Sequence, residues 1–168
     1  MLSAHNVARG VEQPRRYRYK APDEGVLCVQ LSGSDPDDLA IAARRVVAEG
    51  ADLVDLNCGC PQPKIRKKGH GSRLLADPEH LYSLVRALRL AVACPVSVKI
   101  RVDGESGDGV TAAVVEAVVA AGADVLVVHG RHWTERYDSP VHIDELRRVV
   151  ALASIPVIVN GDVTDRAS

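Results

Sequence analysis

Residues 50–57 read GADLVDLN, and residues 122–129 repeat the pattern as GADVLVVH. Each copy begins with a glycine, which suits the left-handed turn that ends many helices. Each continues into a short run of Val and Leu with little polar alternation, which is typical of a strand buried in a parallel sheet. A helix-to-strand turn that occurs twice predicts a repeating β/α architecture.

Three further runs share this apolar, β-branched character. The five expected strands are residues 26–31, 53–57, 96–101, 125–129 and 156–160. Between them, Val, Leu and Ala recur at three- and four-residue intervals, as they do on the buried face of a helix. The four expected helices are residues 35–49, 77–93, 111–121 and 143–153. Residues 1–25 show no clear strand pattern.

A closed (β/α)8 barrel typically needs about 250 residues, whereas this chain has 168. We therefore expect an α/β fold of the TIM type, present as a partial barrel of about five parallel strands with their helices. One domain over residues 1–168 is expected to form it. A small doubly wound sheet that is complete as it stands is the alternative.

The composition excludes several other classes of protein. Hydrophobic residues make up 46% of the chain and charged residues 26%, which excludes disorder for most of it. No apolar run approaches the roughly 18 residues that cross a membrane, and the first residues do not resemble a signal peptide. Four cysteines are too few for a disulfide scaffold. We therefore expect a cytoplasmic protein without membrane contact, while the net charge of −1 leaves the kind of partner open.

Polar residues stand at or near the end of every expected strand. They are Gln30, Asn57, Lys99, His129 and Asn160. One such residue alone is more often a satisfied side chain at the rim of a sheet. Because the carboxyl ends of parallel strands gather at one face, five together predict a functional basin there.

Cys58 and Cys60 lie in the loop that follows the second expected strand. They lack a second cysteine pair or a histidine at ligand spacing, since His70 lies in a glycine loop, and no metal site is expected. Gly59 and Pro61 predict a tight turn that exposes Cys60, the better candidate for a reactive thiol. Burial as small apolar side chains is expected for the other cysteines, which are Cys28, Cys58 and Cys94.

Residues 60–73 contain five Lys or Arg residues and no acidic one. A solvated surface loop explains such a run in many proteins. Beside the expected basin, however, its glycines and cations favour a polyanionic ligand whose phosphates they contact. Together with the basic, tyrosine-bearing segment 14–20, this loop makes nucleic acid a serious candidate partner.

Several short motifs follow one another along the chain. The most specific is DLNCGCP at residues 55–61, followed by Lys64 and by GSRLL at residues 71–75. The others are VQLSGSDP at residues 29–36, VKIR at 98–101, VHGR at 128–131 and NGD at 160–162. In this order and spacing, the chain resembles the tRNA-dihydrouridine synthases from about residue 1 to residue 162.

The resemblance implies an FMN-binding (β/α)8 barrel that reduces particular uridines of tRNA to 5,6-dihydrouridine. FMN would be the cofactor, NADPH or NADH the reductant, and tRNA the partner. The family also carries a small C-terminal helical RNA-binding domain, which we expect to be absent here together with the first and last barrel strands. The full-length protein is expected to be monomeric, and residues 1–168 alone are expected to bind FMN weakly.

By the same resemblance, Cys60 is the catalytic proton donor. Gln30 and Lys99 would contact the flavin ring, and His129 would lie near the cofactor. The implied contacts toward the ribityl-phosphate side are Asn160, Gly161 and Asp162. The implied substrate contacts are Asn57, Lys64, Arg66, Arg101 and Arg131.

Two other functions are alternatives. An FMN barrel of the dihydroorotate dehydrogenase type also places Asn and a Cys-Pro or Ser-Pro turn after a strand, but the basic loop 64–73 and the motif at 129–131 favour the tRNA enzyme. An inactive, truncated relative that only binds RNA is the non-enzymatic alternative. Arg73, where many relatives have Ala, and His132-Trp133, in place of a Thr-rich segment, leave the target uridine open.

Overall fold

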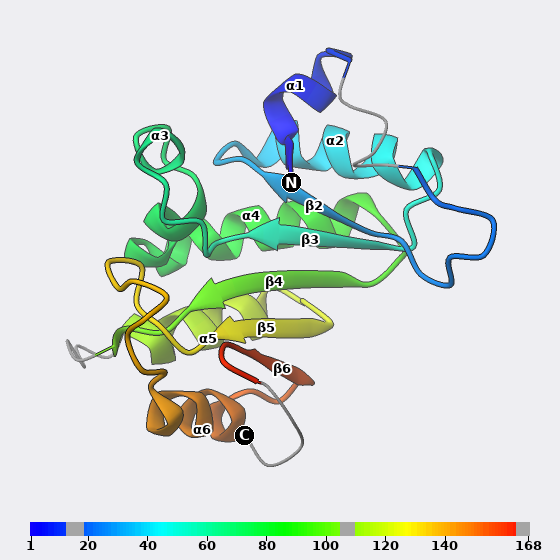
Figure 1. Cartoon of the computed structure of the whole chain (residues 1–168). Helices are drawn as coiled ribbons and strands as arrows, with labels where there is room; N and C mark the ends of the chain where they lie inside the picture. The colour runs from blue at the N-terminus through cyan, green and yellow to red at the C-terminus, as the bar shows by residue number, and fades with distance from the viewer. Residues whose placement is uncertain (13–18, 105–109, 164–168) are drawn as a thin grey trace.

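A computed structural model describes residues 1–12, 19–104 and 110–163. Their six parallel strands form one sheet in which the strands lie in sequence order, β1 to β6 (Figure 1). The strands are β1 Leu2–Ser3, β2 Cys28–Ser32, β3 Leu53–Asn57, β4 Val96–Arg101, β5 Val125–His129 and β6 Val157–Asn160. This order contradicts the doubly wound alternative, in which strand order reverses at a switch point, and confirms the TIM-type α/β expectation.

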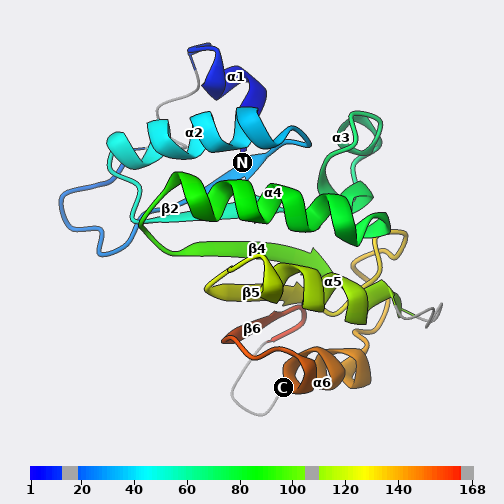
Figure 2. The same cartoon turned by 180° about the vertical axis from the view of Figure 1, so that it is seen from behind.

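Helices connect successive strands, as parallel pairing requires. They are α1 Ala4–Ala8, α2 Pro36–Ala48, α3 Pro63–Arg66, the 3-10 segment Gly71–Ala76, α4 Pro78–Ala91, α5 Val110–Ala120 and α6 Ile143–Leu152. Figure 2 shows α2, α4 and α5 lying across one face of the sheet, and Figure 1 looks onto the opposite face. None of the described helices combines the length and the apolar character needed to span a bilayer.

The expected elements agree closely with the observed ones. Strands β3, β4 and β5 match the predicted ranges residue for residue, and the remaining predicted strands and helices agree within two residues at each end. The expectation that residues 1–25 hold no strand is wrong, because β1 pairs with β2 and raises the described strands from five to six. A two-residue strand is too short to show a period. Of the basic segment 14–20, residues 14–18 lie outside the described residues.

Side-chain alternation divides the sheet into an apolar and a polar face. In β2 to β5, the strand residues that point toward the helices are apolar and almost completely buried, among them Val29, Leu31, Val54, Leu56, Val98 and Ile100. Neighbouring residues point to the other face. There the register places Gln30 beside Asp55, Asp55 beside Ser97, and Asn57 beside Lys99. A row of polar side chains therefore runs across β2, β3 and β4 on the face opposite the helices.

The four cysteines differ in exposure. Cys58 is completely buried, as expected, and Cys60 and Cys94 are partly buried. The expectation that Cys28 is buried is wrong, because this residue is exposed. Cys28 alternates with the buried Val29 and therefore points away from the helices, an orientation that a short apolar run does not reveal.

Candidate active site

A cavity of about 330 Å³ opens at the carboxyl ends of β3, β4, β5 and β6. Six of the residues predicted from the sequence line it, namely Asn57, Cys60, Lys99, Arg101, His129 and Asn160. Its volume lies within the range of small-molecule sites, roughly 300–1,000 Å³. The fold thus gathers side chains from four strand ends and from the loops after β3 and β5 into a single basin.

Lys99 brings a positive charge into this cavity. Its Nζ donates a hydrogen bond to Oδ1 of Asn160 at 3.0 Å, so that the side chains of β4 and β6 meet across β5. Burial lowers the pKa of Lys99, and the nearby Asp55 carboxylate opposes this shift. A partly desolvated ammonium interacts more strongly with a ligand's negative charge than an ammonium in bulk water does.

His129 is neutral at physiological pH. Burial lowers its pKa to about 4, and the positive charges of Arg101 and Lys99 add to the effect. Its ring stacks on Tyr137, with ring centroids 6.2 Å apart and an interplanar angle of 20°. The imidazole can therefore act as one donor and one acceptor toward a ligand without adding charge.

Stability is expected to fall between pH 7 and pH 5 because of His129. Its folded pKa, about 4, lies below the ordinary value near 6.5, so the unfolded chain binds the proton first as the pH falls. The contribution of neutral His129 to the free energy of unfolding is fully present above about pH 6.5 and decreases as the pH falls toward 4. At pH 5 the free energy of unfolding is lower by about 1–2 kcal/mol for this reason. Urea unfolding of the protein and of a His129→Gln variant measures this difference. Equal pH dependence in the two proteins would contradict the assignment.

Arg101 and Arg131 make hydrogen bonds that fix the loops at and beside the cavity. Arg101 is buried and donates from Nε to the carbonyl oxygen of Gly59 at 2.8 Å. Arg131 is 2% exposed and donates to both carboxylate oxygens of Asp162, at 2.8 and 2.5 Å. Arg101 lines the cavity, whereas Arg131, Gly161 and Asp162 stand outside its lining. The Arg131–Asp162 pair ties the end of β6 to the loop after β5.

Hydrogen-bonded amides connect the strands to the Cys60 loop. Asn57 donates from Nδ2 to Oε1 of Gln30 at 2.9 Å, and its Oδ1 accepts from the backbone N–H of Cys60 at 3.0 Å. Gln30 does not line the cavity, and its Nε2 donates to Asp55 at 2.7 Å. Gln30 therefore reaches the site through Asn57.

The basic loop, residues 60–73, contacts the loop after β5. The guanidinium of Arg66 lies 3.4 Å from the centroid of the Trp133 ring, which is a cation–π contact. Arg66 also donates to Oγ of Ser72 at 2.9 Å, and Ser72 Oγ donates to the Cys60 carbonyl at 3.1 Å. Lys64 is exposed to solvent. Arg66 thus helps to shape the loop around Cys60, while Lys64 is accessible to a ligand.

The Gly71→Ala substitution is expected to displace Cys60. Gly71 has a φ of 62°, and a Cβ at this position would lie 2.6 Å from the backbone oxygen of Cys60. We expect at least about 2 kcal/mol lower unfolding free energy, from left-handed strain plus overpacking. The matched control is Gly69→Ala, where φ is 77° but the nearest atom, Ser34 Oγ, is 3.5 Å away. Equal losses of stability and activity in the two variants would contradict a specific clash with Cys60.

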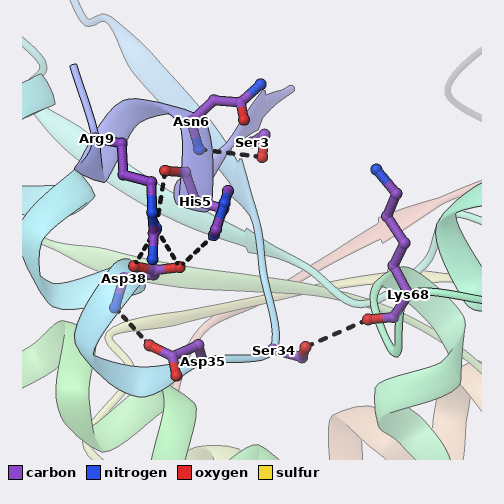
Figure 3. A network of polar contacts seen from close by, with 8 residues as sticks. All are labelled: Ser3, His5, Asn6, Arg9, Ser34, Asp35, Asp38 and Lys68. Atoms are coloured by element: carbon purple, nitrogen blue, oxygen red, sulfur yellow. Dashed lines mark hydrogen bonds and ion pairs between the residues drawn. The ribbon is translucent and has the colours of Figure 1, made fainter. Parts of the chain in front are cut away.

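A second polar network lies beside the carboxyl end of β1, apart from this cavity (Figure 3). Asp38 accepts hydrogen bonds from Nη1 of Arg9 at 2.8 and 3.0 Å and meets Nδ1 of His5 at 2.9 Å. Asp35 caps α2 by accepting from the Asp38 N–H at 2.7 Å. These contacts hold α1 against α2, and we assign the network a structural role.

Sequence reasoning missed several residues of the site. Tyr137 lines the cavity, Trp133 carries the Arg66 contact, and Asp55 and Ser97 support the polar row. Asp55 and Ser97 could have been found, because each stands two positions before a predicted site residue on the same strand face. Tyr137 and Trp133 lie in an irregular loop, where no periodic pattern in the sequence indicates which way a side chain points.

Comparison of the sequence with known proteins finds relatives over its whole length. The family model described as dihydrouridine synthase matches residues 1–168. The chain is 35% identical to tRNA-dihydrouridine synthase B of Serratia marcescens over 98% of this chain and 49% of the relative. For tRNA-dihydrouridine synthase B of Escherichia coli (strain K12), the values are 36%, 98% and 51%. The chain thus spans about half the length of the curated relatives it matches.

Solved structures resemble the fold. A mutant of an active chimera of (S)-mandelate dehydrogenase aligns with a TM-score of 0.50 at 16% identity, over 95% of this chain and 49% of that one. A putative dehydratase from Salmonella enterica serovar Typhimurium aligns with a TM-score of 0.50 at 15% identity, over 75% of this chain and 31% of that one. The likeness concerns the fold alone and agrees with a TIM-type arrangement.

Proposed function

Because the chain belongs to the dihydrouridine synthase family, we propose that it carries the flavin site and the catalytic cysteine of an enzyme that reduces uridines of tRNA to 5,6-dihydrouridine. One observation carries the proposal. A partly buried thiol, an ammonium and a neutral imidazole share one cavity at the carboxyl ends of the strands. Ligands and catalytic groups of TIM-type barrels gather at this face.

The side chains in the cavity fit FMN. Lys99 offers a cation to the edge of a flavin that becomes electron-rich on reduction, and neutral His129 and Asn160 offer hydrogen bonds. Gln30 would support the ring through Asn57, and the loop at Gly161 and Asp162 would lie on the phosphate side. When bound and reduced by NADPH or NADH, FMN would supply the hydride that adds to C6 of uracil.

Cys60 would supply the proton that C5 of the same ring must receive. A cysteine thiol is ordinarily protonated at neutral pH and can act as a general acid. Cys58, two residues away, is completely buried, and burial raises its pKa well above the ordinary thiol value. Of these two thiols, only Cys60 lines the cavity.

The surroundings of the cavity suit RNA. Lys64 lies exposed on the basic loop beside Cys60. We propose that Lys64 and the neighbouring cations of this loop contact phosphates of the RNA. The target uridine must leave its stack to reach the thiol, at a cost of a few kcal/mol that is smaller in a tRNA loop. Arg66 and Arg101 would stabilise the loops around the cavity that would accept the uracil ring. We also propose that the full-length enzyme is monomeric and cytoplasmic.

The test uses protein expressed from its complete coding region, with FMN, NADPH or NADH, and unmodified tRNA. We expect uridines that gain two hydrogens, detected by mass spectrometry of tRNA digests. A protein that reduces or oxidises a free pyrimidine but leaves tRNA unchanged would favour the dihydroorotate dehydrogenase type instead. A protein that binds tRNA and takes up no FMN would show the non-enzymatic alternative to be right.

A further inference from the structure

A chain of hydrogen bonds leads from a buried carboxylate to the backbone of Cys60. Asp55, in the middle of β3, is 4% exposed and stands outside the lining of the cavity. Its Oδ1 accepts from Ser97 Oγ at 2.5 Å, and its Oδ2 accepts from Gln30 Nε2 at 2.7 Å. Gln30 Oε1 then accepts from Asn57, whose Oδ1 accepts from the Cys60 N–H.

The two ends of this chain determine the orientation of both amides. An ionised carboxylate only accepts hydrogen bonds, and a backbone N–H only donates. Gln30 must therefore turn its NH2 group toward Asp55 and its oxygen toward Asn57. Asn57 must in turn present its NH2 group to Gln30 and its oxygen to Cys60. Flipping either amide would place two donors or two acceptors face to face.

We propose that Asp55 is a positioning residue for the reaction: through the amides of Gln30 and Asn57, its carboxylate holds the Cys60 backbone so that the thiol faces the cavity. The inference deepens the proposed function, because it takes Cys60 as the proton donor. Asp55 itself touches neither the cavity nor a reacting atom, and it acts at a distance of two side chains.

Two other contacts support the same loop and limit the expected effect. Arg101 donates to the carbonyl of Gly59 at 2.8 Å, and the N–H of Ser72 donates to the carbonyl of Cys60 at 3.1 Å. Both hold carbonyl oxygens, whereas the Asp55 chain holds the N–H of Cys60. Loss of Asp55 should therefore loosen the loop without removing it.

The buried carboxylate of Asp55 both costs free energy to desolvate and satisfies two hydrogen-bond donors. Burial raises its pKa, which reflects the cost of keeping this charge away from water. Replacing Asp55 alone by an apolar residue leaves the Ser97 hydroxyl and the Gln30 amide without their acceptor, and unpaired buried donors lower stability. The role of Asp55 in orientation is therefore judged from kcat and from Cys60 labelling, both measured under conditions in which each variant is folded.

The test compares three variants of the protein expressed from its complete coding region. Asp55→Leu removes the acceptor for Gln30. Asp55→Asn keeps an oxygen for Gln30 while its NH2 group faces the Ser97 hydroxyl, which can accept, and is the conservative rescue. Ser97→Ala removes the other hydrogen bond of the same carboxylate and is the matched control.

Two readouts report positioning. For Asp55→Leu we expect kcat to fall roughly ten- to a hundredfold, as for a small misplacement of a catalytic group, with KM for tRNA within about twofold. We also expect the rate of iodoacetamide modification of Cys60 to change several-fold relative to Cys60 of the unaltered protein. This labelling ratio does not use Cys28 as a reference, because partial desolvation and the Asp55 charge both raise the pKa of that thiol. Asp55→Asn and Ser97→Ala should stay within about threefold of the unaltered protein on both readouts. If Asp55→Leu does not fold, Asp55→Ser, which is too short to reach Gln30, takes its place.

Wild-type kcat and an unchanged Cys60 labelling ratio in Asp55→Leu would overturn the inference. Equal damage from Ser97→Ala or Asp55→Asn would also overturn it, because a packing role would then suffice. The labelling ratio needs no reaction with tRNA. If Cys60→Ala retained full activity while Asp55→Leu still altered labelling, the proposed function would fail and the positioning by Asp55 would stand.

Discussion

Replacing Cys60 by alanine is expected to lower the rate of dihydrouridine formation by about 10²- to 10⁴-fold, which is the usual contribution of a positioned general acid. FMN binding should stay within about threefold, because alanine removes the proton donor and leaves Lys99, His129 and Asn160 in place. The measurement is a single-turnover assay in which the reduced flavoprotein is mixed with unmodified tRNA. Flavin oxidation and dihydrouridine formation are followed together.

The matched control is Cys58→Ala, which removes the same thiol group two residues away. Cys58 is completely buried among apolar residues, and its loss should cost about 1 kcal/mol of stability through a small cavity. Its catalytic rate should stay close to that of the unaltered protein. Equal losses in both variants, or a loss in Cys58→Ala alone, would exclude Cys60 as the proton donor.

Replacing Lys99 by methionine is expected to weaken FMN binding about ten- to a hundredfold, because a charge-assisted hydrogen bond contributes about 1.5–3 kcal/mol. Methionine keeps most of the length of the side chain and removes the charge. The Asn160 amide also loses the donor that it meets at 3.0 Å. Flavin fluorescence titration of the apoprotein measures the dissociation constant.

The control for this prediction is Lys67→Met, which makes the same change on the exposed side of the basic loop. Lys67 stands outside the cavity lining, and its variant should bind FMN like the unaltered protein. Unchanged affinity in Lys99→Met would place the flavin elsewhere. An equal loss in both variants would point to the overall charge of the protein rather than to a contact in the cavity.

Most of the fold could be predicted from the sequence. The glycine-initiated turns at 50–57 and 122–129 and the β-branched runs predicted β3, β4 and β5 residue for residue. These strands are buried against helices, and their composition follows directly from that burial. β1 could not be predicted, because two residues carry no period and its existence depends on pairing with β2.

The candidate site was predictable where strand ends carry it and at the turn that presents Cys60. Lys99, His129 and Asn160 were expected in one basin because parallel strands end at one face. The partners of each side chain were not predictable, since they depend on register and on loop conformation. For Arg131, which is predicted to face RNA or cofactor, the sequence did not indicate the pairing of the guanidinium with the Asp162 carboxylate. Tyr137 lies in a loop whose path the sequence pattern does not indicate.

The central claim is that FMN binds in the cavity at the carboxyl ends of β3 to β6, beside Cys60. Protection of Cys60 from iodoacetamide by FMN tests it most directly, with labelling of each cysteine resolved by peptide mass spectrometry. We expect the rate of Cys60 labelling to fall as FMN is added, and half of the fall to occur at the FMN concentration at which flavin fluorescence shows half-saturation. The exposed Cys28 at the start of β2 should be labelled at a constant rate throughout. FMN that binds, as the fluorescence shows, and leaves the labelling of Cys60 unchanged would contradict the claim.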